Sequence, residues 1–227
     1  MSPKIYYKKL LHLFQENSVP EQIAPMESYM KNHFDYFGIK SPARKLLLKD
    51  FVKENGIPEG EELQQIVALL WEDPHREMQY AAMEILDKRL RKMDISFLPF
   101  LEKLILKKSW WDTVDWIAAK ACGIFFQKYP EQILPITETW NHSENIWLQR
   151  SSILFQLKYK EQTDFDLLKK YVLYGADSKE FFIRKGAGWA LREYAKSNPT
   201  AVAAFVMENK TVLSNLTIRE ALKHIEG

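Results

Sequence analysis

A 35-residue step in the sequence is the feature that most restricts how this chain can fold. The step joins five positions, which are Tyr80, Asp115, Arg150, Lys185 and Glu220. One further step back reaches Lys45. Small residues follow the repeated position in most copies, although the repeated residue itself changes from aromatic to acidic to basic. A fixed interval that survives such changes is typical of stacked structural units, because each unit packs only on its neighbours.

Apolar residues recur along nearly the whole chain at intervals of three and four, which is the spacing of an amphipathic helix. Few stretches alternate with a period of two, so strands are not expected. The candidate helices span residues 3–16, 21–34, 42–54, 60–72, 75–91, 95–107, 110–128, 131–141, 146–160, 164–175, 179–196, 199–209 and 215–225.

Repeat and helices together predict an all-α fold: a HEAT-like helical-repeat solenoid of stacked antiparallel helix pairs with a concave binding face. The interval is also close to that of tetratricopeptide repeats, but their tryptophan–glycine–tyrosine pattern is absent. The joints between candidate helices are short and do not resemble flexible linkers. We therefore expect one continuous domain over residues 1–227.

The composition indicates a folded, soluble protein. Hydrophobic residues make up 46% of the chain, which is enough for a substantial core. No segment approaches 18 uninterrupted apolar residues, and the N-terminus lacks the apolar run of a signal peptide, so we expect a cytoplasmic protein. Cys122 lies within an apolar helical run and is expected to be buried and inert.

Motifs for metal or cofactor chemistry are not found in the sequence. The five histidines are scattered and none has a partner at the spacing of metal ligands. There is no glycine-rich phosphate loop and no nucleophile elbow. We therefore expect no metal and no cofactor. The net charge of +2 is too small to indicate a nucleic-acid partner by itself, so local basic density has to supply that signal.

Equivalent positions of successive repeats line up along one surface of a solenoid, so the 35-residue step predicts a row of charges. Asp115, Arg150 and Lys185 would form that row. Trp111 precedes Asp115 by one helical turn and shares its face. A carboxylate beside an indole suits a cationic ligand, through charge pairing and a cation–π contact. Helical spacing adds three further residues to the same face, which are Lys158, Trp189 and Arg192.

More ordinary interpretations of this stretch stay open. Ser109 and Asp112 resemble a capping box at a helix start, which would give Asp112 a structural role. Trp110 and Trp111 could both belong to the core. The charges could also simply pair between units, Asp115 with its neighbour in the row especially.

Several segments, in order along the chain, carry a family resemblance. They are YMKNHF (29–34), GIKSP (38–42), KSWWDTVD (108–115), NIWLQR (145–150), FQLKYK (155–160), SKEFFI (178–183) and GWALREY (188–194). These segments resemble the AlkD-type DNA alkylation-repair glycosylases, which are built of HEAT-like repeats. The resemblance covers nearly the whole chain, and several long matches in one order are more specific than a single short motif.

The resemblance implies a monofunctional glycosylase of base excision repair. Members excise cationic alkylated bases such as 3-methyladenine and 7-methylguanine from duplex DNA, and they leave the base largely in the stack. The active-site aspartate and two tryptophans of the family match Asp115, Trp111 and Trp189. The DNA-contacting positions of the family match Arg150, Lys158, Arg192 and Tyr29.

Two lysines complete the predicted DNA-binding set. Lys40 stands where the best-studied relatives carry a glutamine that faces the strand opposite the lesion, so that contact departs from the family pattern. Lys185 belongs to the set because the 35-residue step places it in the charged row. We expect double-stranded DNA containing alkylated purines as the partner, and a monomer without membrane association.

A non-catalytic HEAT-like module that binds DNA structures or acts as a protein scaffold is the alternative function. The combination of Trp111, Asp115 and Trp189 favours the enzyme, because a module that only binds a polyanion has no need of an acid facing it. Salt-sensitive DNA binding would distinguish the glycosylase and the DNA-binding module from a protein scaffold.

Overall fold

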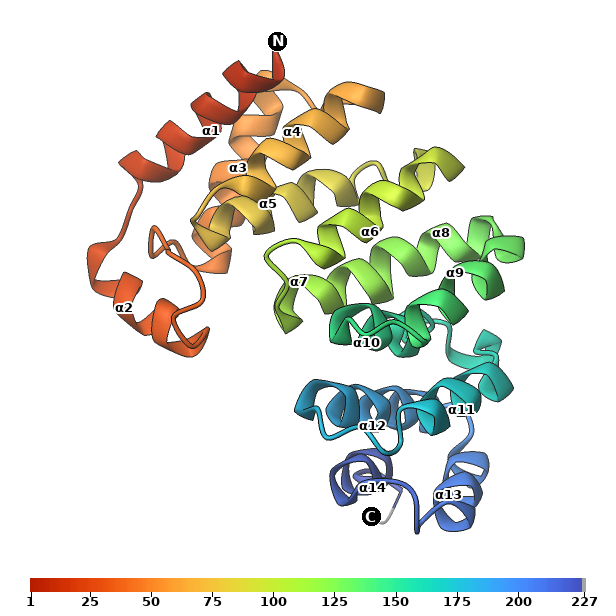
Figure 1. Ribbon diagram of the computed structural model, residues 1–227. Helices are drawn as coiled ribbons and strands as arrows, with labels where there is room; N and C mark the ends of the chain where they lie inside the picture. The colour runs from red at the N-terminus through yellow and green to blue at the C-terminus, as the bar shows by residue number, and fades with distance from the viewer. Residues whose placement is uncertain (226–227) are drawn as a thin grey trace. The chain divides into compact units, whose positions relative to one another are not determined.

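The computed structural model describes residues 1–225 and consists of helices joined by short loops (Figure 1). Within this range no strand forms, and a single isolated bridge joins Asp35 to His75. The chain divides into two compact units, Met1–Asp94 and Ile95–Gly227. The predicted all-α, HEAT-like repeat architecture is confirmed. The prediction of one continuous domain over residues 1–227 stays a prediction.

The N-terminal unit is built around an antiparallel layer of helices. Its helices are α1 (Pro3–Glu16), α2 (Pro20–Tyr29), α3 (Ser41–Asn55), α4 (Gly60–Glu72) and α5 (Arg76–Asp87), followed by the 3-10 turn η1 (Leu90–Lys92). Helix α4 packs between α1 and α5, and α3 contacts both α1 and α5. Leu10, Phe14, Ile66 and Leu70 are fully buried and form the centre of this layer.

The C-terminal unit stacks its helices in sequence order. Its elements are η2 (Ile95–Phe97), α6 (Leu98–Leu106), α7 (Trp111–Trp116), η3 (Ile117–Cys122), α8 (Gly123–Lys128), η4 (Pro130–Gln132), α9 (Ile133–Asn141), α10 (Ile146–Leu154), η5 (Lys160–Gln162), α11 (Phe165–Tyr174), α12 (Phe181–Ala195), α13 (Pro199–Glu208) and α14 (Asn215–Leu222). Helix α10 packs on α12 and α12 packs on α14, while α9, α11 and α13 pair with them (Figure 1). Helices α10, α12 and α14 thus form one layer of the stack.

Small residues allow these neighbouring helices to approach closely, as the sequence predicts. A Cβ on Gly186 of α12 would lie 2.8 Å from Nη1 of Arg150 on α10. A Cβ on Gly188 would lie 2.5 Å from the Cβ of Glu220 and 2.8 Å from the carbonyl oxygen of Thr217, both on α14. Real Cβ contacts are longer than this, so helix α12 needs glycine on both sides of Ala187.

The capping-box hypothesis at the start of α7 is wrong. Helix α7 begins at Trp111 with Trp110 as its N-cap, and the Trp110 side chain makes no capping hydrogen bond. The Ser109 hydroxyl instead donates to the carbonyl oxygen of Ile105 at 2.5 Å. Ser109 therefore satisfies a carbonyl group at the end of α6, the preceding helix, rather than opening the next one.

Several predicted helices end or change type earlier than expected, and three of these carry predicted site residues. The segment predicted at 21–34 ends at Tyr29, because Lys31 and Asn32 adopt left-handed backbone angles. The segment predicted at 110–128 contains a π-helical stretch at Ile117–Cys122, and such stretches often lie beside functional sites. The segment predicted at 146–160 ends at Leu154, which moves Lys158 into the turn that follows.

A side chain explains the early end of α10. The Gln156 amide donates to the Asp164 carbonyl oxygen at 3.2 Å and accepts from the Asp164 N–H at 2.7 Å. This pairing gives the chain an alternative to helical hydrogen bonds. The prediction that Lys158 lies two helical turns beyond Arg150 on one face is therefore wrong.

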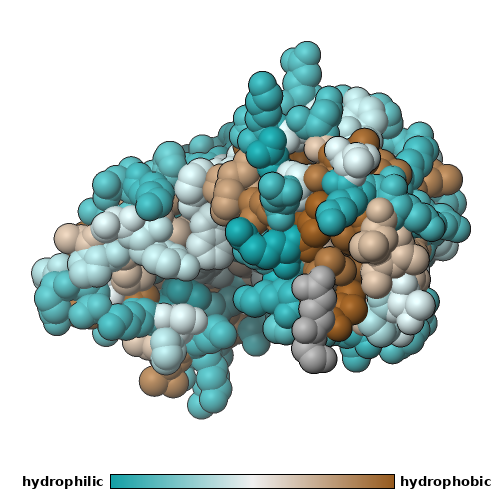
Figure 2. All heavy atoms as spheres, turned by 90° about the horizontal axis from the view of Figure 1, so that it is seen from below, coloured by the Kyte–Doolittle hydropathy of each residue, from teal (hydrophilic) through white to brown (hydrophobic). Residues whose placement is uncertain are grey.

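The face of the molecule seen in Figure 2 carries mostly hydrophilic residues, with hydrophobic residues in patches. Among the described residues, no helix combines the length and apolarity needed to cross a bilayer. Two aromatic side chains are unusually exposed for their size: Tyr29 is 70% exposed and Phe181 is 57% exposed. Tyr29 is one of the predicted DNA-contacting residues, and Phe181 lies beside the predicted site.

Candidate functional site

A pocket of about 300 Å³ in the C-terminal unit brings most of the predicted site residues together. Helix α7 supplies two of the lining residues, α10 supplies one, and α12 supplies the rest along most of its length. The residues that line the pocket are Trp111, Asp115, Arg150, Phe181, Phe182, Lys185, Trp189 and Arg192. The 35-residue step therefore predicted neighbours in space as well as in pattern.

Asp115 and Arg150 form a bidentate ion pair at the base of this pocket. Arg150 donates from Nε to Oδ1 of Asp115 at 2.6 Å and from Nη2 to Oδ2 at 2.8 Å. The Arg150 side chain is only 4% exposed and the Asp115 side chain 14% exposed. The ion pair between units, left open by the sequence, is thus present. Parallel donation of this kind fixes the carboxylate plane as well as its charge.

Arg150 also binds the backbone of α12. Its Nη1 group donates to the carbonyl oxygen of Phe182. Three of the five N–H groups of the guanidinium are engaged in these contacts, so the side chain retains donors for a ligand. In this structure Arg150 is a buried residue that orients Asp115, and its predicted contact with DNA stays a prediction.

Burial raises the pKa of Asp115 above its ordinary value of 3.8. The hydrogen bonds and the positive charge of Arg150 oppose this rise, while the nearby Asp112 adds to it. Ionisation of the Asp115 carboxyl group is therefore unfavourable in this buried position, and the positive charge of Arg150 partly compensates for the loss of water. A carboxylate that is largely removed from water interacts strongly with a cation that comes close to it.

The two adjacent tryptophans at the start of α7 have different environments. Trp110 packs against Trp147 and Phe182, with ring centroids 5.8 and 5.1 Å away. Trp111 is half-buried and lines the pocket. Both tryptophans are half-buried, so neither belongs to the fully buried core; Trp110 packs in an aromatic cluster, whereas Trp111 lines the pocket. The cluster around Trp110 also supports Phe182, whose carbonyl oxygen holds Arg150.

Trp189 faces the same pocket from α12, between two basic residues. Lys185 precedes it by one turn and Arg192 follows it by nearly one turn. Both bases contact one carboxylate: Lys185 Nζ lies 2.6 Å from Oε1 of Glu220, and Arg192 Nη1 lies 2.5 Å from Oε2. Sequence reasoning placed Glu220 on the repeated position but assigned it no role. Its position in the 35-residue row was the signal that could have found it.

Three predicted DNA-contacting residues do not line this pocket. Lys158 is exposed in the turn after α10. Tyr29 is exposed at the end of α2, and Lys40 is exposed just before α3, both in the N-terminal unit. Their predicted contacts with DNA stay predictions.

The loop that carries Lys40 is held by a buried carboxylate that the sequence did not reveal. Glu77 accepts hydrogen bonds from the backbone N–H groups of Phe37, Gly38 and Ile39 at 3.0–3.2 Å. Gly38 has φ +82°, and a Cβ there would lie 2.2 Å from the carbonyl oxygen of Val19. The loop before Lys40 therefore has one tightly specified conformation.

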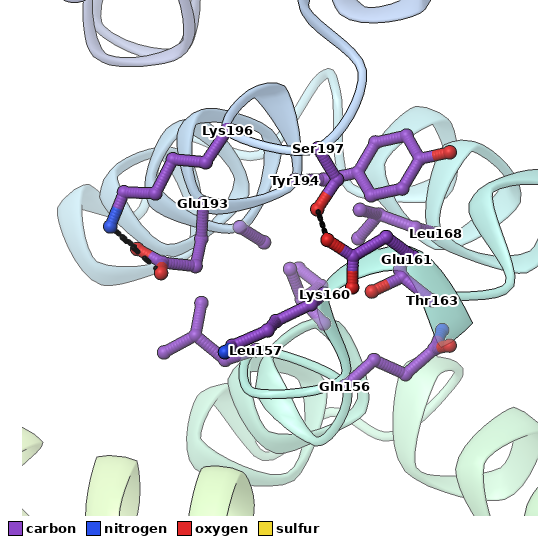
Figure 3. Close-up of a pocket in the computed structure, with 12 residues that line it drawn as sticks. Gln156, Leu157, Lys160, Glu161, Thr163, Leu168, Glu193, Tyr194, Lys196 and Ser197 are labelled. Carbon is purple, nitrogen blue, oxygen red and sulfur yellow. Dashed lines mark hydrogen bonds and ion pairs between the residues drawn. The ribbon is translucent and has the colours of Figure 1, made fainter.

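A smaller cavity of about 130 Å³ lies between α10, α11 and α12 (Figure 3). Some of the charged and polar groups around it pair with one another: Lys196 with Glu193, and Ser197 with Glu161. Gln156 is engaged with the backbone of Asp164. None of the predicted site residues lines this cavity.

No group of three or more histidine, cysteine, aspartate or glutamate side chains within residues 1–225 could hold a metal ion. Cys122 is buried in the π-helical stretch, as the sequence predicts. Burial also raises the pKa of its thiol, which keeps the thiol protonated and unreactive.

A stack of helix pairs carrying a pocket with two indoles and an oriented carboxylate defines a HEAT-like repeat protein with a site suited to a cation. The family described as "DNA alkylation repair enzyme" matches residues 10–225, and the chain belongs to this family. Membership makes DNA the substrate and the repair of alkylated DNA the general role.

A solved structure supports this assignment. It is described as a predicted DNA alkylation repair enzyme from Enterococcus faecalis, and it superposes with a TM-score of 0.84 at 34% sequence identity. The similarity covers 92% of this chain and 96% of that chain. A comparison with curated proteins gives no match.

Proposed function

We propose that this protein is a monofunctional DNA glycosylase that hydrolyses the N-glycosidic bond of cationic alkylated purines, such as 3-methyladenine and 7-methylguanine, in duplex DNA. One observation carries the proposal: Trp111, Trp189 and the Arg150-oriented carboxylate of Asp115 line a single pocket. Two indoles and an acid favour a cationic ligand, and an alkylated purine in DNA is such a ligand.

The chemistry suits a lesion that is already a good leaving group. Alkylation at a ring nitrogen makes the base cationic, so the glycosidic bond breaks with its electron pair passing to the base, which leaves neutral. The sugar becomes oxocarbenium-like, and water adds to C1′ while its proton passes to solvent. Asp115 stabilises the positive charge as it develops on the sugar and orients the attacking water. Preorganised charge of this kind is usually the largest catalytic contribution.

Trp111 and Trp189 contribute recognition of the positive charge. A cation over an indole face gains roughly 0.5–2 kcal/mol, with the higher value in a desolvated site. The two rings come from different helices, α7 and α12, so the stacking of the helix pairs sets the gap between them. A neutral base gains no such attraction, which makes the two tryptophans a filter for charged lesions.

The basic residues hold the DNA backbone. Lys185 and Arg192 flank Trp189 on α12, and Arg150 keeps unused donors at the pocket. Lys158, Tyr29 and Lys40 are proposed to contact the backbone away from the pocket. Each phosphate contact releases counterions, so affinity falls as salt rises.

The lesion is proposed to react without full extrusion from the helix. Most glycosylases flip the base into a deep, snug pocket. The pocket here is an open hollow whose acid is proposed to serve the sugar, and none of its lining residues is an obvious general acid for a neutral base. Fluorescence of 2-aminopurine placed beside the lesion tests this: it should rise little on binding, whereas a large rise would indicate base flipping.

Release of 7-methylguanine from methylated duplex DNA tests the proposal as a whole. The wild type should release the base, and Asp115→Asn should lose at least about tenfold in rate while it still binds DNA. Asp177→Asn, an exposed aspartate of the same unit, serves as the matched control and should keep full activity.

Two other outcomes assign other functions. DNA binding by the wild type without base release would indicate a module that recognises DNA structures. A wild type that neither binds DNA nor releases 7-methylguanine would indicate a protein scaffold.

A further inference from the structure

Glu220 of α14 joins the two basic residues that flank Trp189. Lys185 and Arg192 are seven residues apart on α12, which is two helical turns, so they lie on one face with Trp189 between them. One oxygen of Glu220 contacts Lys185 at 2.6 Å and the other contacts Arg192 at 2.5 Å. Both bases line the pocket, whereas Glu220 supports them from outside it.

The packing of α14 on α12 fixes where this carboxylate stands. Gly188 lets the Cβ of Glu220 approach to a distance that no side chain on α12 would permit. The hydroxyl of Thr217 donates to the carbonyl oxygen of Arg184 at 3.1 Å, which ties the start of α14 to the same helix. The Glu220 side chain is 10% exposed, so its conformation is set by protein contacts and not by solvent.

The charge of Glu220 is unusual for its location. The hydrogen bond from Lys185 and then the one from Arg192 lower the pKa of Glu220 against its partial burial, so it is ionised at neutral pH. An ionised carboxylate next to two cations that are proposed to bind phosphate works against affinity for DNA. The same two ion pairs join α14 to α12 and fix the positions of both bases at the pocket.

We propose that Glu220 is a positioning residue: it holds Lys185 and Arg192 on the two sides of Trp189 and thereby fixes where the bound DNA backbone lies relative to Asp115. The inference deepens the proposed function, because it assumes that the pocket binds DNA. Lysine and arginine side chains lose much rotamer freedom when they are held, and Glu220 fixes this geometry before DNA arrives.

Removing the negative charge of Glu220 should change DNA affinity and the rate of base release in opposite directions. Glu220→Gln frees both bases and removes one negative charge, so the variant should bind undamaged duplex more tightly, with a steeper dependence on salt. The bound backbone would no longer have one defined position. The rate of 7-methylguanine release at saturating DNA should therefore fall, by roughly tenfold for neighbours coupled in this way.

The experiment compares the wild type, Glu220→Gln and the control Glu131→Gln, which replaces an exposed glutamate of the same unit. It measures duplex affinity across salt concentrations, single-turnover release of 7-methylguanine, and the thermal unfolding midpoint. Release by Glu220→Gln should fall while affinity rises, and the control should match the wild type. In a Lys185→Met, Arg192→Met background, Glu220→Gln should change the release rate by less than about twofold, because the two side chains through which Glu220 acts are absent.

Three results would overturn the inference. They are unchanged release by Glu220→Gln, parallel loss of release and affinity with a lowered unfolding midpoint, and an undiminished effect in the double-methionine background.

If Glu220→Gln does not fold, Glu220→Asp is the second variant, because it keeps the charge and shortens the side chain. Slower release with an unchanged salt slope is then expected, and release at the wild-type rate contradicts the role. If the wild type binds DNA but releases no base, the proposed function fails, and the salt slopes still decide whether Glu220 restrains the two bases.

Discussion

Two charge clusters in the C-terminal unit use the same chemistry with opposite electrostatic results. Asp115 pairs with one base, and burial raises the pKa of Asp115 above its ordinary value. Glu220 pairs with two bases, and their hydrogen bonds lower the pKa of Glu220. In this comparison, the number of basic partners and the depth of burial together set the direction in which the pKa of the acid moves.

The difference fits the roles that we propose for the two acids. A catalytic carboxylate gains from being buried with a single counter-charge, because a cationic transition state can then add to the stabilisation of its negative charge. A positioning carboxylate gains from being fully satisfied, because its task is to hold two side chains still. The 35-residue repeat places an acid at both positions, and the two acids differ in the basic side chains that pack against them.

Breaking the buried pair should have the largest effect on stability. Arg150→Met leaves Asp115 buried without its counter-charge, and the free energy of unfolding should fall by about 3–5 kcal/mol. Urea denaturation measures this loss. Arg219→Met, at an exposed arginine of α14, is the control and should differ little from the wild type.

Adding Asp115→Asn to Arg150→Met sharpens the same test. A neutral amide needs no counter-charge, so the double variant should recover a measurable part of the lost stability. If the second substitution makes the protein still less stable, the single loss does not come from an unpaired buried charge.

The contact between α12 and α14 should show the next largest effect. Gly188→Ala forces a methyl group against Glu220 and Thr217, and overpacking of this kind costs about 1–3 kcal/mol. At Gly175 an added Cβ would lie 3.1 Å from the Ile183 Cγ2 atom and 3.9 Å from the Tyr171 carbonyl oxygen, so Gly175→Ala should cost less. Equal unfolding midpoints for the two variants would contradict the close approach of the helices.

The two acids should give stability–pH slopes of opposite sign. The folded state of the wild type holds the Asp115 proton more tightly than the unfolded state does, so this contribution to stability declines as pH rises from 3.8 through the folded pKa. The Glu220 contribution is present above its ordinary value of 4.5 and is lost as pH falls through the lowered folded pKa.

Unfolding free energies of the wild type, Asp115→Asn and Glu220→Gln between about pH 3 and 7 test these slopes. The advantage of the wild type over Asp115→Asn should shrink with rising pH, and its advantage over Glu220→Gln should grow. Slopes of the same sign would remove the contrast between the two clusters.

Lys158 should show the smallest effect. It lies outside the pocket, so Lys158→Met should lower the slope of log affinity against log salt by about one and leave the release rate at saturating DNA unchanged. Lys210→Met, at an exposed lysine after α13, is the control. A slower release step in Lys158→Met would place this residue closer to the chemistry than the structure does.

The repeat predicted much of the fold and the membership of the site, because a constant step makes equivalent residues neighbours. It left partner choice open. The repeated positions 115, 150, 185 and 220 each carry a charge; pairing of Asp115 with Arg150 was one interpretation among several, and pairing of Glu220 with Lys185 was not expected, so only the packed structure shows both pairs. Pairing depends on rotamers and burial, which the pattern of residue types does not contain.

Helix ends were the weaker part of the sequence analysis. Ser109 and Gln156 bond to backbone groups, and their helix-ending effect depends on which group lies within reach. The two adjacent tryptophans at 110 and 111 point in different directions, so Trp110 packs in an aromatic cluster and Trp111 lines the pocket. Glu77 was missed because the peptide groups it binds lie 38–40 residues away in sequence.

Selectivity for charge tests the central claim most directly. Single-turnover release should be measured for 7-methylguanine and for uracil in the same duplex sequence, with the wild type. The account predicts release of 7-methylguanine and negligible release of uracil, because uracil is neutral and needs a proton that the pocket does not supply. Release of both bases at comparable rates would show that stabilisation of a cationic lesion by Asp115 and the two tryptophans is not how this protein works.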